Sequence, residues 1–156
     1  MEKWILDRLN ATADEVNKQL TERNFLMATN AVYNFWLYEL CDVYIVSCVT
    51  SGHSRFLTGF QEAMKPMTDE TASFATKKSA QQTLYTCLDY GLRLLHPFMP
   101  FVTEELWQRL PRIPDDTTPS IMISRYPVFV SAGHSWHCYI CLIYWRRIKI
   151  SYSRTR

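Results

Sequence analysis

The feature that most constrains this chain is the helical period of its apolar residues. Between residues 3 and 21 they recur at spacings of three and four, which places them on one face of a helix opposite the charged side chains. This face consists of Trp4, Ile5, Leu9, Ala13, Val16 and Leu20. Only 4 of the 156 residues are glycine, which favours long helices over a turn-rich β fold. We therefore predict a first helix over 3–21.

The same period predicts a second and a third helix. The second starts at residue 25 or 28 and runs to Tyr44, and it is unusually rich in aromatic side chains. The third covers 77–95 and carries Gly91 on its apolar face. Glycine inside a helix costs about 1 kcal/mol relative to alanine, so we predict that another helix approaches closely at Gly91. Residues 46–75 lose the period and are predicted as loop.

Prolines delimit the fourth helix. Pro97 ends the third helix, because the residue before a proline disfavours the helical conformation. The fourth helix starts at 100–103 and runs to Leu110, and 121–126 is predicted as a short extended segment. Four helices with short joints predict an all-α fold, an antiparallel helix bundle.

The charge of the chain is unevenly distributed. Residues 128–156 hold five basic and no acidic side chains, so the remaining 12 basic and 15 acidic side chains give residues 1–127 a net charge of −3. An acidic body gives no bulk attraction for nucleic acid. Any RNA contact must therefore come from a local patch.

Cysteine use and the N-terminus predict a cytoplasmic protein. The 5 cysteines are odd in number, and Cys41 and Cys87 lie in apolar helical patterns. Free thiols in a reducing compartment explain this better than a disulfide framework does. We see no signal-peptide pattern. The longest apolar run, 139–145, is far shorter than the roughly 20 residues that span a bilayer, so no membrane partner is expected.

Three segments carry a family resemblance: KWILDRL at 3–9, NFWLYELCDVY at 34–44 and LRLLHPFMPFVTEELWQRLP at 92–111. In this order they resemble the helical anticodon-binding domain of valine–tRNA ligases, which are class I aminoacyl-tRNA synthetases. Leucine and isoleucine ligases share the last segment more loosely. The resemblance covers roughly residues 1–45 and 62–127. It implies a bundle that follows the catalytic domain and receives the anticodon arm of valine tRNA.

The first predicted helix offers a small RNA-binding surface. Recognition of RNA loops uses aromatic stacking and guanidinium contacts. Lys3, Trp4 and Arg8 supply one ring and two cations, and Trp4 and Arg8 are four residues apart on one helical face. Alternatively, Trp4 is a core residue and Arg8 is a solvated or ion-paired charge. Arg93 and Arg109 are weaker candidates, because a charge on a bundle helix is usually a solvated one.

We predict no catalytic residue in this chain. The resemblance implies that amino-acid activation uses HIGH-type and KMSKS-type motifs, and neither occurs here; no Gly-rich phosphate loop occurs either. His96 is interpreted as a structural or capping residue, and Glu104 and Glu105 as residues that suit the positive end of a helix dipole. ATP and magnesium are expected in the parent enzyme, with no cofactor or metal in this chain.

Two functions remain open from the sequence. The first is the tRNA anticodon-binding domain of a valine–tRNA ligase, which contributes to valyl-tRNA aminoacylation beside the remainder of the synthetase. The second is a non-catalytic helical protein-interaction module derived from a synthetase. They differ in whether cationic and aromatic groups gather on one accessible face.

Two segments depart from the family pattern. Without residues 46–61, CDVYI at 41–45 runs directly into EAMKP at 62–66, as the resemblance implies. Val46 codons begin with GT and a Gln61 codon can end in AG, which are the borders of an intron. We therefore predict a helical domain over 1–127 with an insertion at 46–61.

The C-terminal segment 128–156 is predicted to be a non-homologous, poorly ordered tail. It has no acidic side chain and no clear helical period. It contains His134, His137, Cys138 and Cys141, which are zinc-type ligands. Chance composition explains this group better, and no metal site is predicted.

The transcript tests the predicted insertion. We expect cDNA to join the codon of Ile45 directly to that of Glu62, with GT and AG at the genomic borders. Sequencing of a spliced transcript that retains codons 46–61 would contradict the insertion.

Overall fold

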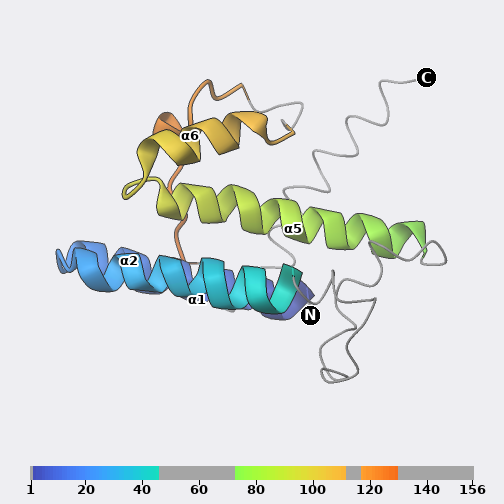
Figure 1. Cartoon of the computed structure of the whole chain (residues 1–156), viewed down its shortest axis with the longest axis horizontal. Coiled ribbons are helices and arrows are strands. Elements are labelled where there is room, and N and C mark those ends of the chain that lie inside the picture. Colours follow the sequence, from blue (N-terminus) through green and yellow to red (C-terminus); the bar gives the residue numbers. More distant parts are fainter. Residues whose placement is uncertain (1, 46–72, 112–116, 130–156) are drawn as a thin grey trace.

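The structure, a computed structural model, describes residues 2–45, 73–111 and 117–129 (Figure 1). Three helical rods form a bundle. They are α1 (Glu2–Thr21), α2 (Phe25–Asn34) continued by the π-helix η1 (Phe35–Ile45), and α5 (Phe74–Leu95).

A second layer covers the bundle on one side. It consists of α6 (Pro100–Arg109), which packs on α5, and the 3-10 helix η2 (Ile121–Ile123), which packs on α6. The described residues contain helices and no strand, so the predicted all-α class is confirmed.

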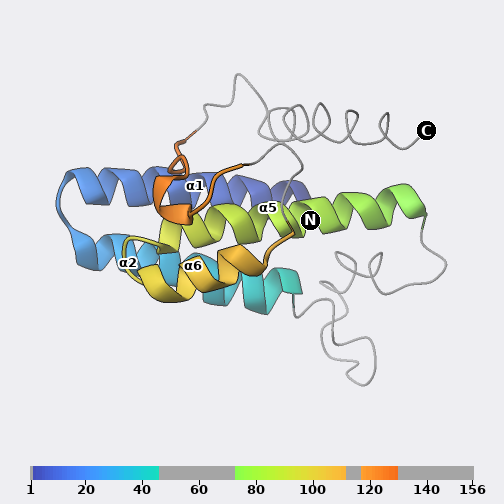
Figure 2. The ribbon, with the colours of Figure 1, turned by 90° about the horizontal axis from the view of Figure 1, so that it is seen from above.

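Consecutive helices run in opposite directions, as predicted, but α1 and α5 are parallel neighbours. Figures 1 and 2 show both helices running away from the end marked N. The Ser79 hydroxyl donates to Glu2 Oε2 at 2.7 Å, which joins the starts of the two helices. The α1–α2 turn and the α5–α6 joint therefore lie together at the opposite end.

The core of the bundle is built from the predicted apolar stripes. It buries Ile5, Leu6, Leu9, Ala13, Val16, Ala28, Val32, Phe35, Leu40, Tyr44, Cys87 and Leu94. Burial raises the pKa of the Cys87 thiol to about 12, so it stays protonated at neutral pH. Cys87 and the half-buried Cys41 are free thiols.

The π-helical geometry of η1 corrects the single α-helix predicted up to Tyr44. The side chains of Phe35, Leu40 and Tyr44 are all buried, and the step from Phe35 to Leu40 is five residues. An α-helical step of four would turn Glu39 toward the core, whereas hydrogen bonds of the i to i+5 type match the observed spacing. The wider turn places Glu39 at the seam with α1, where it accepts from Arg8 Nε at 2.7 Å.

Two smaller differences concern segment ends. α5 begins at Phe74, a position predicted as loop. The predicted extended segment 121–126 starts instead with η2, because Ser120 Oγ accepts from the amide of Met122 at 3.1 Å. Residues 46–61, on which the insertion was predicted, lie outside the described residues, as do the tail beyond residue 129 and its four zinc-type ligands.

The Trp36 indole joins the two layers. It packs against the bundle core and also against a second cluster of Leu92, Trp107 and Ile121. Its Nε1 donates to the carbonyl of Gly91 at 3.3 Å. A Cβ at position 91 would lie 2.9 Å from Trp36 Cζ2. The predicted close approach at Gly91 is therefore present.

We predict that Gly91→Ala lowers the free energy of unfolding by about 1 kcal/mol. Overpacking against a rigid ring costs about 1–3 kcal/mol, which exceeds the gain of about 1 kcal/mol in helix propensity. Urea unfolding followed by tryptophan fluorescence measures this. In a Trp36→Leu background the ring is gone, and the same substitution should stabilise the chain; destabilisation there would contradict the explanation.

Candidate nucleic-acid interface

The α1–α2 turn and the α5–α6 joint form one end of the molecule, which we call the loop end (residues 22–24 and 96–99). Figures 1 and 2 both show these segments at the end opposite the N-terminus of α1. At 1.5 Å per residue, the 20 residues of α1 separate the two ends by about 30 Å. Side chains at the two ends therefore belong to different surfaces.

The α1–α2 turn is closed by hydrogen bonds that reverse the chain within three residues. The amide of Asn24 donates to the carbonyl of Gln19 at 2.8 Å, and the amide of Arg23 donates to that of Leu20 at 3.1 Å. These bonds form a Schellman motif, which needs a left-handed residue and usually uses glycine. Here Arg23 occupies that position with φ 60°. The Asn24 side chain then caps α2 by accepting from the amide of Met27 at 3.2 Å.

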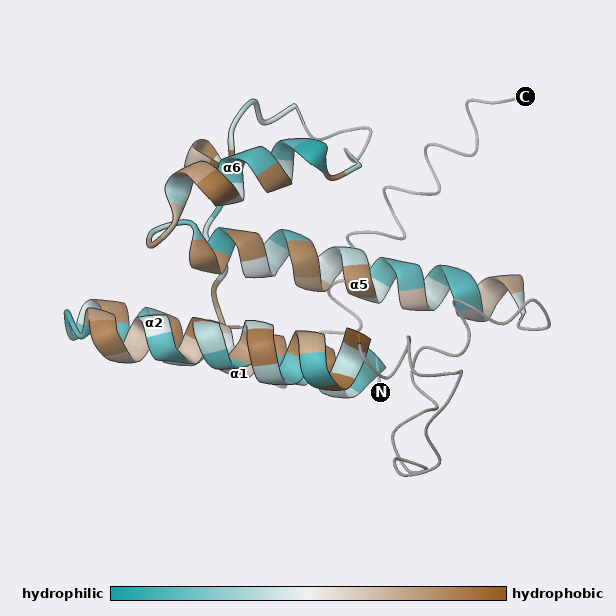
Figure 3. Ribbon diagram, in the orientation of Figure 1, coloured by the Kyte–Doolittle hydropathy of each residue, from teal (hydrophilic) through white to brown (hydrophobic). Residues whose placement is uncertain are grey.

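Large apolar side chains are exposed on both sides of the loop end. Phe25 is 62% exposed at the start of α2, and Phe101 is 89% exposed at the start of α6. Leu26, Met27, Met99 and Met122 are also exposed. In Figure 3 the polar turn and the apolar starts of α2 and α6 lie at this same end. Exposed rings beside a turn can stack on unpaired bases.

Cations without an acidic partner lie at the same end. Lys18 lies in the last turn of α1 and Arg23 in the turn that follows, and the carbonyl of Arg125 is bonded to Arg93 in the last turn of α5. All three are exposed, and within the described ranges no ion pair involves them. The other described arginines, by contrast, are all bound to carboxylates. The loop end therefore combines aromatic rings with available positive charge.

A strap formed by residues 117–129 ties α6 to α5 and α1. Glu104 holds its first part, since it accepts from Ser120 Oγ at 2.7 Å and from the amide of Ile121 at 3.2 Å. Hydrogen bonds from Gln108 and Ser120 hold the pKa of Glu104 below its ordinary value. At the other end of the strap, Asn17 Nδ2 donates to the carbonyl of Pro127 at 2.9 Å.

Tyr126 fixes the middle of the strap against the bundle. Its hydroxyl donates to the carbonyl of Leu94 at 3.3 Å, and its ring packs on the core. Burial raises the pKa of Tyr126 to about 12, so this hydroxyl remains a donor at neutral pH.

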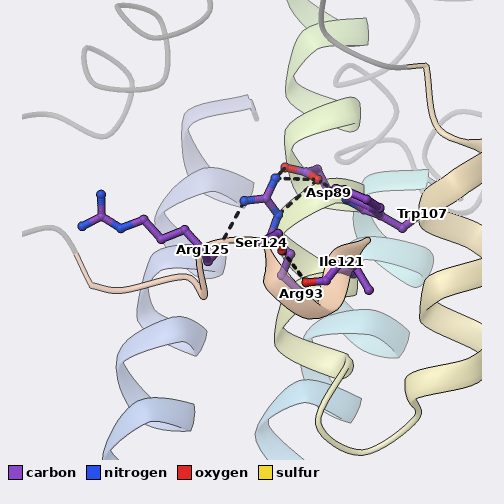
Figure 4. A network of polar contacts seen from close by, with 6 residues as sticks. All are labelled: Asp89, Arg93, Trp107, Ile121, Ser124 and Arg125. Carbon is purple, nitrogen blue, oxygen red and sulfur yellow. Dashed lines mark hydrogen bonds and ion pairs between the residues drawn. The ribbon is translucent and has the colours of Figure 1, made fainter. Parts of the chain in front are cut away.

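A buried ion pair connects the two layers and the strap (Figure 4). Asp89 and Arg93, whose side chains are 5% and 16% exposed, pair at 2.8 Å. Trp107 Nε1 donates to Asp89 Oδ1 at 2.7 Å. The far side of the Arg93 guanidinium donates to the carbonyl of Arg125 at 3.3 Å. One carboxylate thus links α5, α6 and the strap.

His96 has the structural role that the sequence predicted. Its amide closes the end of α5 on the carbonyl of Leu92, and its Nδ1 lies 2.7 Å from Thr103 Oγ1. The Thr103 hydroxyl donates to the carbonyl of Met99 at 2.8 Å. The ring therefore braces the α5–α6 joint.

The described residues contain no group of three potential metal ligands, and none of their helices has the length and apolarity needed to cross a bilayer.

Residues 2–139 match the protein family described as the anticodon-binding domain of tRNA ligase. The chain belongs to this family. Among curated proteins it is 52% identical to the valine–tRNA ligase of Schizosaccharomyces pombe over 128 residues, which are 82% of this chain and 11% of that protein. It is 44% identical to the Homo sapiens valine–tRNA ligase over 127 residues, which are 81% of this chain and 9% of that protein.

A third relative is the mitochondrial valine–tRNA ligase of Saccharomyces cerevisiae, at 44% identity over 131 residues, 84% of this chain and 10% of that protein. The chain thus spans about a tenth of the length of the relatives it matches. The resemblance to the anticodon-binding domain of valine–tRNA ligases is confirmed.

In this anticodon-binding domain the five predicted RNA-binding residues do not form one surface. Lys3, Trp4 and Arg8 share the start of α1, away from the loop end. Arg93 and Arg109 lie in the last turns of α5 and α6. The three arginines are paired with carboxylates.

The individual environments separate these five residues further. Lys3 is exposed, and Trp4 is 37% exposed. The hydrogen bond that Arg8 donates to Glu39 holds the pKa of Arg8 above its ordinary value. This is the ion-paired alternative considered from the sequence. Arg93 is enclosed by Asp89 and lies 5.5 Å from the centre of the Tyr90 ring.

Sequence reasoning missed the exposed groups of the loop end: Arg23, Phe25, Phe101 and Arg125. A signal for two of them was present. The helices predicted over 3–21 and from residue 25 or 28 leave Arg23 in the joint between them, and the fourth helix was predicted to start at 100–103, beside Phe101. A residue next to a helix start in a short turn is often solvent-exposed. No such signal marked Arg125.

Asp89→Asn should lower the free energy of unfolding by about 3 kcal/mol, because it leaves Arg93 as a buried cation without its counter-charge. Chemical denaturation measures this. Glu105→Gln is the matched control: it removes the carboxylate of another i, i+4 pair, whose partners Arg109 and Glu105 are 72% and 66% exposed. That change should cost less than about 1 kcal/mol. Equal costs would contradict the central role of Asp89.

Proposed function

We propose that this chain binds the anticodon arm of a valine tRNA through the loop end, as part of a valine–tRNA ligase. The observation that carries the proposal is the gathering of two exposed phenyl rings and three exposed cations at one end of an anticodon-binding domain. None of these cations has an acidic partner among the residues that the structure describes. Phe25 and Phe101 offer stacking faces to unpaired loop bases. Lys18, Arg23 and Arg125 offer positive charge to the neighbouring phosphates.

The proposal favours RNA over a protein-interaction module. A protein-binding face would surround the exposed rings with apolar side chains and few charges, because charged residues are depleted at the centre of protein interfaces. At the loop end exposed apolar side chains lie beside the rings, but three exposed cations are present as well. RNA recognition uses this combination of stacking and positive charge.

Lys3 and Trp4 remain candidates for a second contact at the start of α1. Arg8, Arg93 and Arg109 rank lower, because each already neutralises a carboxylate. Ion-paired guanidinium groups attract phosphate less strongly than free ones.

The wider setting also belongs to the proposal. The remainder of a ligase would supply the ATP and magnesium chemistry of valyl-tRNA formation, since no catalytic constellation was found in the sequence. Cytoplasmic translation is the proposed setting. The free thiols of Cys41 and Cys87 suit this reducing compartment.

Titration of the full 156-residue chain with the anticodon stem–loop of valine tRNA tests the proposal. We expect a dissociation constant in the micromolar range, because few phosphates are neutralised. Exchange of the anticodon bases should weaken binding by about tenfold, as should Phe25→Ala or Phe101→Ala, since one stacked base contributes about 1–3 kcal/mol. Equal affinity for valine and exchanged anticodons would overturn the proposal.

Arg23→Gly provides a control for folding within the same titration. Glycine fits the left-handed conformation that costs a non-glycine residue about 1 kcal/mol or more, so this variant should unfold at a higher temperature while it loses the cation. Weaker RNA binding by a more stable chain cannot result from unfolding. Unchanged affinity would exclude Arg23 from the interface.

A further inference from the structure

Within the strap, the backbone of Arg125 is bound by a side chain of the buried ion pair. Its carbonyl accepts from Arg93 Nη1 at 3.3 Å. Arg93 is itself oriented by Asp89, which accepts from Arg93 Nε at 3.3 Å and from Arg93 Nη2 at 3.1 Å. The buried pair therefore reaches the surface through the main chain of Arg125.

The residues on either side of this contact are also fixed. Before it, Ser124 Oγ donates to the carbonyl of Ile121 at 2.7 Å. After it, Tyr126 and Pro127 are bound to α5 and α1 through Leu94 and Asn17, respectively. The backbone at position 125 is thus fixed by contacts before it, after it and at its own carbonyl, although it belongs to an irregular segment.

The side chain of Arg125 is turned away from this network. Figure 4 shows the side chain of Arg125 extending away from Asp89 and Arg93. It is exposed, and no carboxylate within the described part of the chain forms an ion pair with it. A guanidinium in this state retains its full fork of donors for a phosphate.

We propose that Arg125 binds a backbone phosphate of the RNA, and that Arg93 and Asp89 are positioning residues that hold it in place. This inference rests on the proposed function. Because the backbone is already fixed, binding has to order only the side chain of Arg125. Such preorganisation strengthens binding. Arg93 does not itself reach the RNA, since its donors are engaged by Asp89 and by the carbonyl of Arg125.

The first part of the test removes the Arg125 cation. Arg125→Gln in the full chain should weaken binding of the valine anticodon stem–loop about tenfold at low salt. It should also reduce the slope of log K against log salt by roughly one phosphate contact. Lys78→Gln is the matched control, because Lys78 is an exposed cation near the start of α5, at the other end of the bundle. We expect the control to change affinity less than twofold.

The second part is a double-mutant cycle that separates positioning from a general structural role. The pair Asp89→Asn and Arg93→Gln is made together, so that no buried charge is left alone. If the pair positions Arg125, Arg125→Gln should change affinity less than twofold in this background. A structural role that weakens the domain as a whole predicts additivity, with the tenfold effect retained. Thermal unfolding verifies that each variant is folded at the titration temperature.

The outcomes distinguish this inference from the function on which it rests. A wild-type chain that does not bind the stem–loop overturns the proposed function and this inference with it. A wild-type chain that binds, with Arg125→Gln unchanged in affinity and salt slope, overturns this inference alone. Additive effects in the cycle overturn the positioning role of Arg93 and Asp89.

Discussion

The contact between the Trp36 indole and the backbone of Gly91 is the constraint on which the two layers of this domain depend. Trp36 belongs to both apolar clusters, and it reaches the second one only because position 91 has no side chain. If the helices stood further apart, Leu92 and Trp107 would lose their packing against the indole. Trp107 would then no longer be held where its Nε1 meets Asp89. The polar network around Asp89 therefore depends on the apolar packing at Gly91.

The charges of the domain divide into structural and available groups. Arg8, Arg93 and Arg109 are paired with carboxylates. The pair of Arg8 with Glu39 joins two distant segments of the sequence, and Arg93 reaches another one through the carbonyl of Arg125. The cations at the loop end have no such partners within the described residues. A body with a net charge of −3 can still attract a polyanion at one place, because exposed charges are screened beyond about 10 Å at moderate salt. For binding a polyanion, the local arrangement of charges therefore matters more than the net charge.

The sequence predicted the fold well where helical period and proline dominate. The bounds of α1 and α6, and the close approach at Gly91, agree with the structure because each depends on local spacing. The π-helix was missed, because Trp36, Leu40 and Tyr44 are spaced by four residues, which is the spacing of an α-helix. Which arginines form ion pairs, and how deeply these pairs are buried, could not be predicted in the same way. Glu39 lies 31 residues from Arg8, and two pairs with identical i, i+4 spacing differ entirely in burial.

The chain leaves η1 at Ile45 and re-enters the described structure at Ser73, and the adjoining helix ends both lie away from the loop end (Figure 1). The connection between these two points can therefore change in length without moving the α1–α2 turn or the α5–α6 joint. Evolution can extend or shorten the chain there while leaving the opposite end intact. The same separation makes this connection a suitable place for a fluorescent label or an affinity tag.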